Sequence, residues 1–129
     1  MLTVGLIGAG RIGQVHASTI SMHAHSKLVA VADVIEDNAQ KLARDFGGQA
    51  CTVDAIYKDK SIDAVLVASS TDTHSEIIEK ATLAGKAVFC EKPVDISLVR
   101  AKQCLDNTKP NGQPIMLSLI HISEPTRPY

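Results

Sequence analysis

The sequence predicts an α/β domain with a doubly wound parallel sheet. Short apolar runs alternate with longer amphipathic segments along nearly the whole chain of 129 residues. The first apolar run leads directly into the glycine-rich segment Gly8–Gly13, and the second ends at an acidic residue, Asp33. A chain of this length has room for one domain with a hydrophobic core.

Six short runs rich in Val, Ile, Leu and Ala are expected to form the strands. They are Leu2–Gly8, Lys27–Asp33, Gln49–Val53, Ile62–Ser69, Lys86–Glu91 and Gln113–Leu117. Runs that are apolar at successive positions, rather than at alternate ones, are typical of parallel strands buried on both faces.

The segments between these runs are expected to form crossover helices. They are 11–22, 35–47, 54–59, 72–85 and 95–108. Several carry apolar residues three or four positions apart, as Leu42 and Phe46 do, and Gly47 and Gly85 are placed to end two of them. Repeated strand, helix, strand units predict a parallel sheet with helices on both faces.

The glycine-rich segment has the spacing G-x-G-x-x-G at the point where a strand should turn into a helix. Gly8 would permit the tight turn, Gly10 would let the backbone approach a pyrophosphate, and Gly13 would let the helix pack close to the strand. The N–H groups and positive end of that helix would hold the phosphates. We therefore expect the loop, with Arg11 and Ile12 in it, to bind a dinucleotide cofactor.

Asp33 lies twenty residues beyond Gly13, at the end of the second predicted strand. An acid in this position can accept hydrogen bonds from both hydroxyls of an adenosine ribose. The alternative is a solvent-facing aspartate that caps the following helix. Val34 and Ile35 follow in place of an arginine, so nothing nearby would neutralise a 2′-phosphate. The sequence therefore favours NAD over NADP.

Polar residues also follow the fourth predicted strand, in the stretch Ser69-Ser70-Thr71-Asp72-Thr73-His74. Ligands of open parallel sheets bind beyond the carboxyl ends of the strands, so Ser69, Thr71 and His74 are expected to bind the cofactor. Thr71 or Asp72 is also expected to cap the next helix. His74 could equally be a structural histidine on the first turn of that helix.

The fifth predicted strand is followed by Glu91-Lys92-Pro93. A lysine directly after a buried run is in a costly place for a charge unless it meets a partner. We expect Lys92 to be functional, although a surface lysine at a strand end is the alternative.

Composition and charge argue against several kinds of partner. Thirteen Lys and Arg against fourteen Asp and Glu give a formal net charge of −1, with no basic tract and few aromatic residues, so nucleic acid is not expected to bind. The apolar run at the start is too short to span a bilayer and lacks a basic leader, so no membrane association is expected.

The cysteines and histidines do not form a predicted metal site. Cys51, Cys90 and Cys104 are odd in number and fit neither a disulfide framework nor a zinc knuckle, which favours a reducing, cytoplasmic setting and buried packing roles. His23 and His25 lack a third ligand nearby and are expected in a solvated loop.

Three stretches, "VGLIGAGRIGQVHA", "ASSTDTHSEIIEKA" and "VFCEKPVD", resemble the N-terminal half of the Gfo/Idh/MocA oxidoreductases. The resemblance covers Leu2 to about Met116, and "SSTDTH" with "FCEKPVD" is most similar to the inositol 2-dehydrogenases of that family. It implies a Rossmann-like NAD-binding domain over residues 1–116. It also implies that a second, α+β catalytic domain is missing from this chain.

The resemblance assigns roles near the cofactor. In the family the lysine of the Glu-Lys-Pro triplet lies beside the nicotinamide and contacts the substrate hydroxyl, which implies a catalytic role for Lys92 and a place at the cofactor edge for Glu91. The general base would belong to the second domain. The parent protein is then expected to be a homo-oligomeric NAD-dependent dehydrogenase acting on a cyclic polyol, with myo-inositol as the leading candidate. The alternatives are an NADP-dependent sugar or dihydrodiol dehydrogenase of the same family and a non-catalytic NAD-binding module.

The ending "LSLIHISEPTRPY", residues 117–129, departs from the family pattern. Its codons can be written to match a transposase adapter used in sequencing libraries. We therefore expect residues 117–129 to be a non-native tail. The alternative is a sixth strand followed by a tail broken by Pro125 and Pro128.

Overall fold

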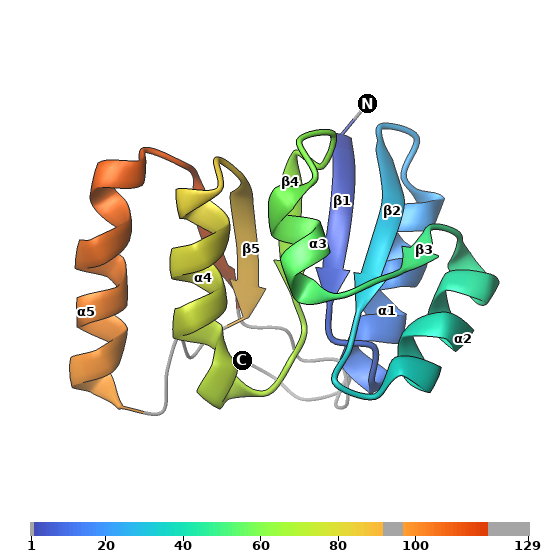
Figure 1. The fold of residues 1–129 in the computed structure, drawn as a ribbon, viewed down its shortest axis with the longest axis horizontal. Coiled ribbons are helices and arrows are strands. Elements are labelled where there is room, and N and C mark those ends of the chain that lie inside the picture. Colours follow the sequence, from blue (N-terminus) through green and yellow to red (C-terminus); the bar gives the residue numbers. More distant parts are fainter. Residues whose placement is uncertain (1, 92–96, 119–129) are drawn as a thin grey trace, which may run out of the picture.

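The computed structural model describes residues 2–91 and 97–118, which form a six-stranded parallel sheet with helices on both faces (Figure 1). The strands are β1 (Leu2–Ile7), β2 (Ser26–Ala32), β3 (Gln49–Ala50), β4 (Ala64–Val67), β5 (Ala87–Glu91) and β6 (Ile115–Ser118). The helices are α1 (Arg11–Met22), α2 (Glu36–Phe46), α3 (Val53–Lys58), α4 (His74–Leu83) and α5 (Leu98–Thr108), with 3₁₀ turns η1 (Thr71–Thr73) and η2 (Lys109–Asn111).

The strand order is β3-β2-β1-β4-β5-β6, and every neighbouring pair is parallel. The order changes direction between β1 and β4, because the chain first builds outward from β1 to β3 and then returns to β1's other side. The predicted doubly wound parallel sheet is therefore confirmed.

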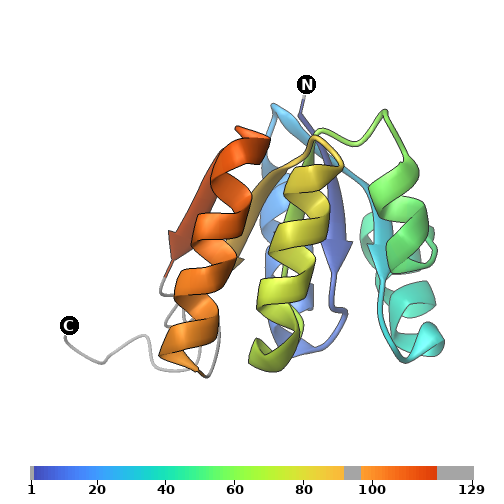
Figure 2. The ribbon, with the colours of Figure 1, turned by 60° about the vertical axis from the view of Figure 1, so that its left-hand side comes forward.

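Each face of the sheet has its own apolar layer. Alternate residues of β1 face opposite ways, so that Val4 and Leu6 pack with α1 and α2 while Ile7 joins the layer beneath α3, α4 and α5. Figure 2 shows α4 and α5 side by side on the near face, with α1 behind the sheet. Glu79 of α4 joins these two helices by accepting hydrogen bonds from Arg100 and, at 2.8 Å, from Asn107 Nδ2.

The predicted strands and helices all appear, and most of their ends are shifted by one to three residues. The third strand ends at Ala50 instead of Val53, because Thr52 is the N-cap of α3 and its Oγ1 accepts a hydrogen bond from the N–H of Ala55 at 3.1 Å. The prediction that Thr71 or Asp72 caps α4 is wrong. Those residues form η1, and α4 begins at His74 without a side-chain cap.

Glycines end two helices, as the sequence predicts. Gly47 follows α2 with φ +97°. Gly85 follows α4 with φ +84°, and the N–H groups of Gly85 and Lys86 donate to the carbonyls of Thr82 and Ala81. This pair of bonds is a Schellman motif, which needs the left-handed backbone that glycine adopts without strain.

Polar groups pair with each other at the edge where the strands begin. Lys86, only 2% exposed, donates from Nζ to the carbonyl oxygens of Asp59 at 2.6 Å and Ile62 at 2.9 Å. Burial lowers the pKa of Lys86 below its usual range. Nearby, Asp63 Oδ2 accepts hydrogen bonds from the backbone N–H and the hydroxyl of Thr3, and these bonds lower the pKa of Asp63.

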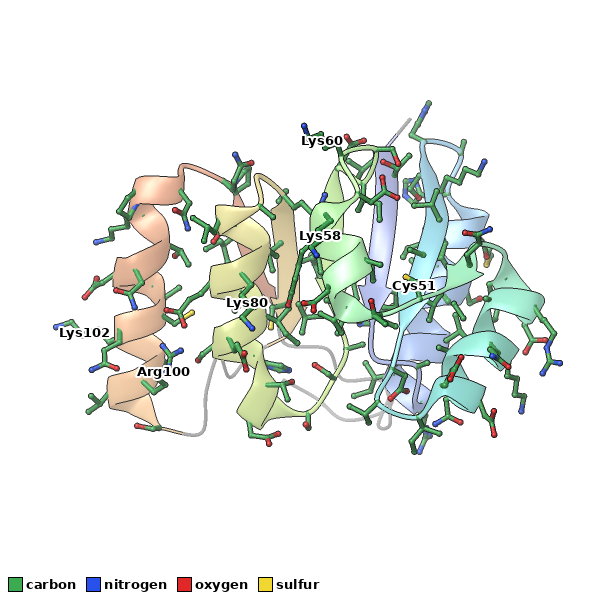
Figure 3. All side chains as sticks on the ribbon, in the orientation of Figure 1. Cys51, Lys58, Lys60, Lys80, Arg100 and Lys102 are labelled. Carbon is green, nitrogen blue, oxygen red and sulfur yellow. The ribbon has the colours of Figure 1, made fainter. Side chains whose placement is uncertain are left out.

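The cysteines and the His23–His25 loop fit the expected structural roles. Cys90 and Cys104 are fully buried, and Cys51 is half-buried beside the core, where desolvation raises its pKa (Figure 3). His23 and His25 are exposed. Within residues 2–91 and 97–118, no cluster of three or more metal-ligating side chains is found, and no helix is long and apolar enough to cross a bilayer.

Candidate functional site

The glycine loop between β1 and α1 has a shape that only glycine permits at two positions. Gly8 has φ +106°, and a Cβ on it would lie 2.5 Å from backbone atoms of Ala68 at the end of β4. A Cβ on Gly13 would lie 2.1 Å from the carbonyl oxygen of Gly8. The absence of a Cβ at these two positions lets the loop pack against the end of β4 and lets the first turn of α1 pack against the loop.

Gly10 differs from the other two because a Cβ there would meet no atom within 4 Å. Gly10 is the N-cap of α1, where it makes no side-chain capping bond, and the first turn of α1 contains no acidic residue. Arg11 and Ile12 in that turn are exposed. A helix start of this kind, without a side-chain cap and with open space beside Gly10, is suited to an anionic ligand.

Asp33 lies just past the end of β2 and is partly buried beneath the glycine loop. Its Oδ2 accepts a hydrogen bond from the N–H of Ala9 at 2.9 Å, and its Oδ1 accepts one from the N–H of Ile35 at 3.2 Å. A carboxylate offers about four acceptor positions, so two bonds leave acceptor capacity for a ligand. Asp33 is therefore both part of the loop's structure and able to receive hydroxyl groups.

The residues after β4 form a second polar segment beside the loop. The Oγ atoms of Ser69 and Thr73 lie 2.7 Å apart, and Thr73 also donates to the carbonyl of Ser70 at 2.6 Å. His74 is 4% exposed, and its Nε2 lies 3.0 Å from the carbonyl oxygen of Ser69. The buried ring of His74 thus contacts the Ser69 backbone. Thr71 lies in η1 and is partly buried.

A cleft of about 570 Å³ brings these segments together at the carboxyl edge of the sheet. It is lined by the glycine loop (Gly8, Ala9, Gly10), by Asp33, Val34, Ile35 and Asn38 after β2, and by Ser69, Ser70 and Thr73 after β4. Of the predicted cofactor residues, Gly8, Gly10, Asp33 and Ser69 line this cleft. Val34, 98% exposed, presents an apolar surface at its rim.

The far wall of the cleft was not predicted from the sequence. It consists of Tyr57 and Asp54 of α3 with Glu76 and Lys80 of α4, and Lys80 Nζ lies 2.7 Å from Glu76 Oε1. Lys80 can be located on α4 in Figure 3. Desolvation, with the nearby negative charges of Glu76 and Asp54, raises the pKa of Tyr57 to about 12. The available signal was that α3 and α4 both follow strands that end at this edge of the sheet.

Glu91 and Lys92 mark the limit of the described site. Glu91 is the last residue of β5, and its backbone pairs with Ser118 of β6. Lys92, the predicted catalytic residue, lies outside the described residues.

The parallel sheet, its glycine loop and the cleft at the change of strand direction define a dinucleotide-binding domain of the Rossmann type. The chain belongs to the Gfo/Idh/MocA oxidoreductase family, whose NAD-binding Rossmann fold it matches over residues 2–119. The predicted family resemblance and the NAD-binding fold are thereby confirmed.

Similar proteins include an inositol 2-dehydrogenase from Rhizobium meliloti (strain 1021), which is 48% identical over 101 residues, 78% of this chain and 31% of that protein. A crystal structure of a myo-inositol dehydrogenase from Corynebacterium glutamicum ATCC 13032 is similar with a TM-score of 0.85 and 34% identity, over 92% of this chain and 36% of that one.

The scyllo-inositol dehydrogenase from Lactobacillus casei, solved with bound cofactor NAD(H) and scyllo-inositol, has a TM-score of 0.83 and 27% identity, over 91% of this chain and 36% of that one. The present chain spans about a third of the length of the relatives it matches.

Proposed function

We propose that this chain binds NAD in the cleft at the carboxyl edge of its sheet, as the cofactor domain of a dehydrogenase that oxidises a secondary alcohol of a cyclic polyol. The observation that carries the proposal is the open space at Gly10, in front of the uncapped start of α1 and next to Asp33. The similarity to inositol 2-dehydrogenases supports myo-inositol as the leading substrate.

The glycine loop would hold the pyrophosphate. Without a Cβ at Gly10, phosphate oxygens can reach the backbone N–H groups of the first turn of α1, and the helix dipole favours their negative charge. No acidic side chain in that turn opposes them. Arg11 and Ile12, both exposed, would contribute backbone N–H groups to the same site.

Asp33 would accept hydrogen bonds from the ribose hydroxyls, and the same carboxylate would repel a 2′-phosphate. Val34 and Ile35 follow it on the rim of the cleft and offer no positive charge to offset that repulsion. Ser69, Thr71 and Glu91 would contact the cofactor from the ends of β4 and β5, and His74 would act by holding Ser69 in place.

Bound NAD would supply the chemistry by taking a hydride from the carbinol carbon. Lys92, one residue beyond β5, would orient and polarise the reacting hydroxyl. As a cation it cannot take the hydroxyl proton, so a separate base is required.

Calorimetric titration with NAD and with NADP tests the cofactor proposal. We expect NAD to bind the chain more tightly than NADP, and Asp33→Ala to narrow the difference because it removes both the ribose acceptor and the repulsion. Asp45→Ala, an exposed acid on α2 outside the cleft, is the matched control and should leave the difference unchanged. Equal or tighter binding of NADP to the wild-type chain would contradict the proposal.

A chimaera tests the substrate. Residues 2–118 would replace the matching segment of the Rhizobium meliloti inositol 2-dehydrogenase. We expect NADH formation with myo-inositol, and a loss of at least about a hundredfold in turnover for Lys92→Ala in the chimaera. A chimaera that binds NAD but turns over sugars, and no inositol, would show that the polyol assignment is wrong.

A further inference from the structure

We propose that Asp33 has a second role beyond reading the ribose: its carboxylate positions the glycine loop to receive the pyrophosphate. This inference rests on the proposed binding of NAD. It concerns a hydrogen bond within the protein that is present before any ligand binds.

The end of β2 holds the loop through two successive backbone N–H groups. The N–H of Gly8 donates to the carbonyl of Ala32 at 2.8 Å, and the N–H of Ala9 donates to Asp33 Oδ2 at 2.9 Å. The first bond continues the pairing of β1 with β2. The second extends that pairing past the end of the strand, with a side chain in place of a backbone carbonyl.

Ala9 lies between Gly8, which turns the chain, and Gly10, which faces the open space. It is 2% exposed, so water could not easily replace Asp33 as the partner of its N–H group. If that N–H lost its acceptor, the peptide of Ala9 would have to turn to find another partner. Gly10, next in the chain, would move with it.

The other oxygen of Asp33 fixes the carboxylate itself. Oδ1 accepts from the N–H of Ile35, two residues further along, which anchors the side chain to the turn that leads into α2. Asp33 therefore links the loop before α1 to the loop before α2. Because an ionised carboxylate makes shorter and stronger hydrogen bonds than a neutral group, it is well suited to this link.

The electrostatic effect of Asp33 on a pyrophosphate acts in the opposite direction. A negative charge bonded to Ala9 lies close to where phosphate oxygens would bind, and by repulsion alone it would weaken their binding. The positioning role thus gives a result that repulsion cannot: removing the acid should weaken the binding of a nucleotide even when that nucleotide has no ribose hydroxyl.

The test compares ADP with 2′,3′-dideoxy-ADP, which keeps the diphosphate and lacks both ribose hydroxyls. Dissociation constants would be measured for the wild-type chain, Asp33→Ala, Asp33→Asn and the surface control Asp45→Ala. We expect Asp33→Ala to raise the dissociation constant for dideoxy-ADP about tenfold, because the loop loses the acceptor that anchors it. Asp33→Asn keeps an acceptor oxygen for Ala9 and should stay within about threefold of wild type for this ligand.

Amide hydrogen exchange in the absence of ligand gives an independent measurement. The N–H of Ala9 should exchange at least about tenfold faster in Asp33→Ala than in wild type or Asp33→Asn. The N–H of Val65 in β4 should be unchanged, which shows that the variant is folded.

Two results would overturn the inference while leaving the proposed function intact. One is wild-type affinity of Asp33→Ala for dideoxy-ADP, and the other is unchanged exchange at Ala9. If the wild-type chain binds neither NAD nor ADP, the proposed function fails and the inference fails with it.

Discussion

The two edges of the sheet use polar residues in different ways. At the edge where the strands begin, the polar groups bond to one another: Lys86 caps two carbonyls and Asp63 pairs with Thr3. At the edge where the strands end, polar groups surround a cleft of about 570 Å³, and a Cβ built on Gly10 meets no neighbouring atom.

This difference separates residues that stabilise the fold from residues that are placed for a ligand. Hydrogen bonds at the first edge connect β1, β4 and β5 where those strands start, and the polar groups of Lys86, Asp63 and Thr3 are used in these bonds. At the second edge the backbone is held in place by glycine packing and by Asp33, and open space remains in front of it. Substitutions at the first edge should therefore change the free energy of unfolding, and substitutions at the second should change ligand affinity.

The largest effect is expected in the glycine loop. Gly13 is needed for packing and Gly10 faces open space, although the two lie only three positions apart. In Gly13→Ala the new methyl group would lie 2.1 Å from the carbonyl oxygen of Gly8, so we expect the free energy of unfolding to fall by about 3 kcal/mol or more. In Gly10→Ala the methyl group would meet no protein atom, and the free energy of unfolding should stay within about 0.5 kcal/mol of wild type.

NAD affinity should respond the other way at Gly10. The methyl group of Gly10→Ala would occupy the space proposed for the pyrophosphate, and we expect at least about a tenfold loss of affinity. Urea denaturation and calorimetric titration of both variants measure the two effects. Full NAD affinity in Gly10→Ala would remove this residue from the proposed cofactor site.

Much of this arrangement could be predicted from the sequence, because the strands are continuous apolar runs and the loop has a fixed glycine spacing. The roles of Gly8 and Gly13 in packing follow from that spacing. The bond from Ala9 to Asp33 could not be predicted, because it joins residues 24 positions apart through a side chain whose rotamer depends on the folded loop. The predicted start of α4 was wrong for a related reason, because a 3₁₀ turn, η1, precedes that helix.

The hydrogen bonds at the edge where the strands begin were also not predicted from the sequence. Lys86 reads in the sequence as an ordinary charged residue at the start of an apolar run, and only the turns at Asp59 and Ile62 reveal its two acceptors. Tyr57 was missed in the cleft because α3 has only six residues, which is too short for its sequence periodicity to predict which side faces the cleft.

Lys86→Met should have the second-largest effect and should act on stability alone. The substitution keeps the aliphatic stem but leaves the carbonyls of Asp59 and Ile62 without their donor, so we expect a loss of about 1–3 kcal/mol in the free energy of unfolding. Lys27→Met, at an exposed position in β2, is the matched control and should be near neutral. NAD affinity of the folded Lys86→Met chain should equal that of wild type.

The same lysine predicts a pH dependence with a definite sign. Its pKa is lowered in the folded chain, so between that pKa and the unfolded value of about 10.5 the unfolded chain binds more protons than the folded one. The contribution of Lys86 to stability should therefore increase as pH rises through this range. Denaturation curves at several alkaline pH values should show the increase in wild type, and its persistence in Lys86→Met would assign it to another group.

The smallest expected effect concerns Tyr57, on the far wall of the cleft. Desolvation and the charges of Glu76 and Asp54 raise its pKa from 10.0 to about 12, so between these values the folded chain keeps a phenolic proton that the unfolded chain loses. The contribution of Tyr57 to stability should accordingly decrease as pH rises from about 10 to about 12, opposite in sign to the contribution of Lys86.

Phenolate absorbance in a Tyr129→Phe background isolates Tyr57, because the chain has two tyrosines. Circular dichroism on the same samples reports whether the chain is still folded at each pH. Phenolate formation near pH 10 in a folded chain would mean that the ring is open to solvent, and the far wall would then offer a ligand less burial than the cleft geometry indicates.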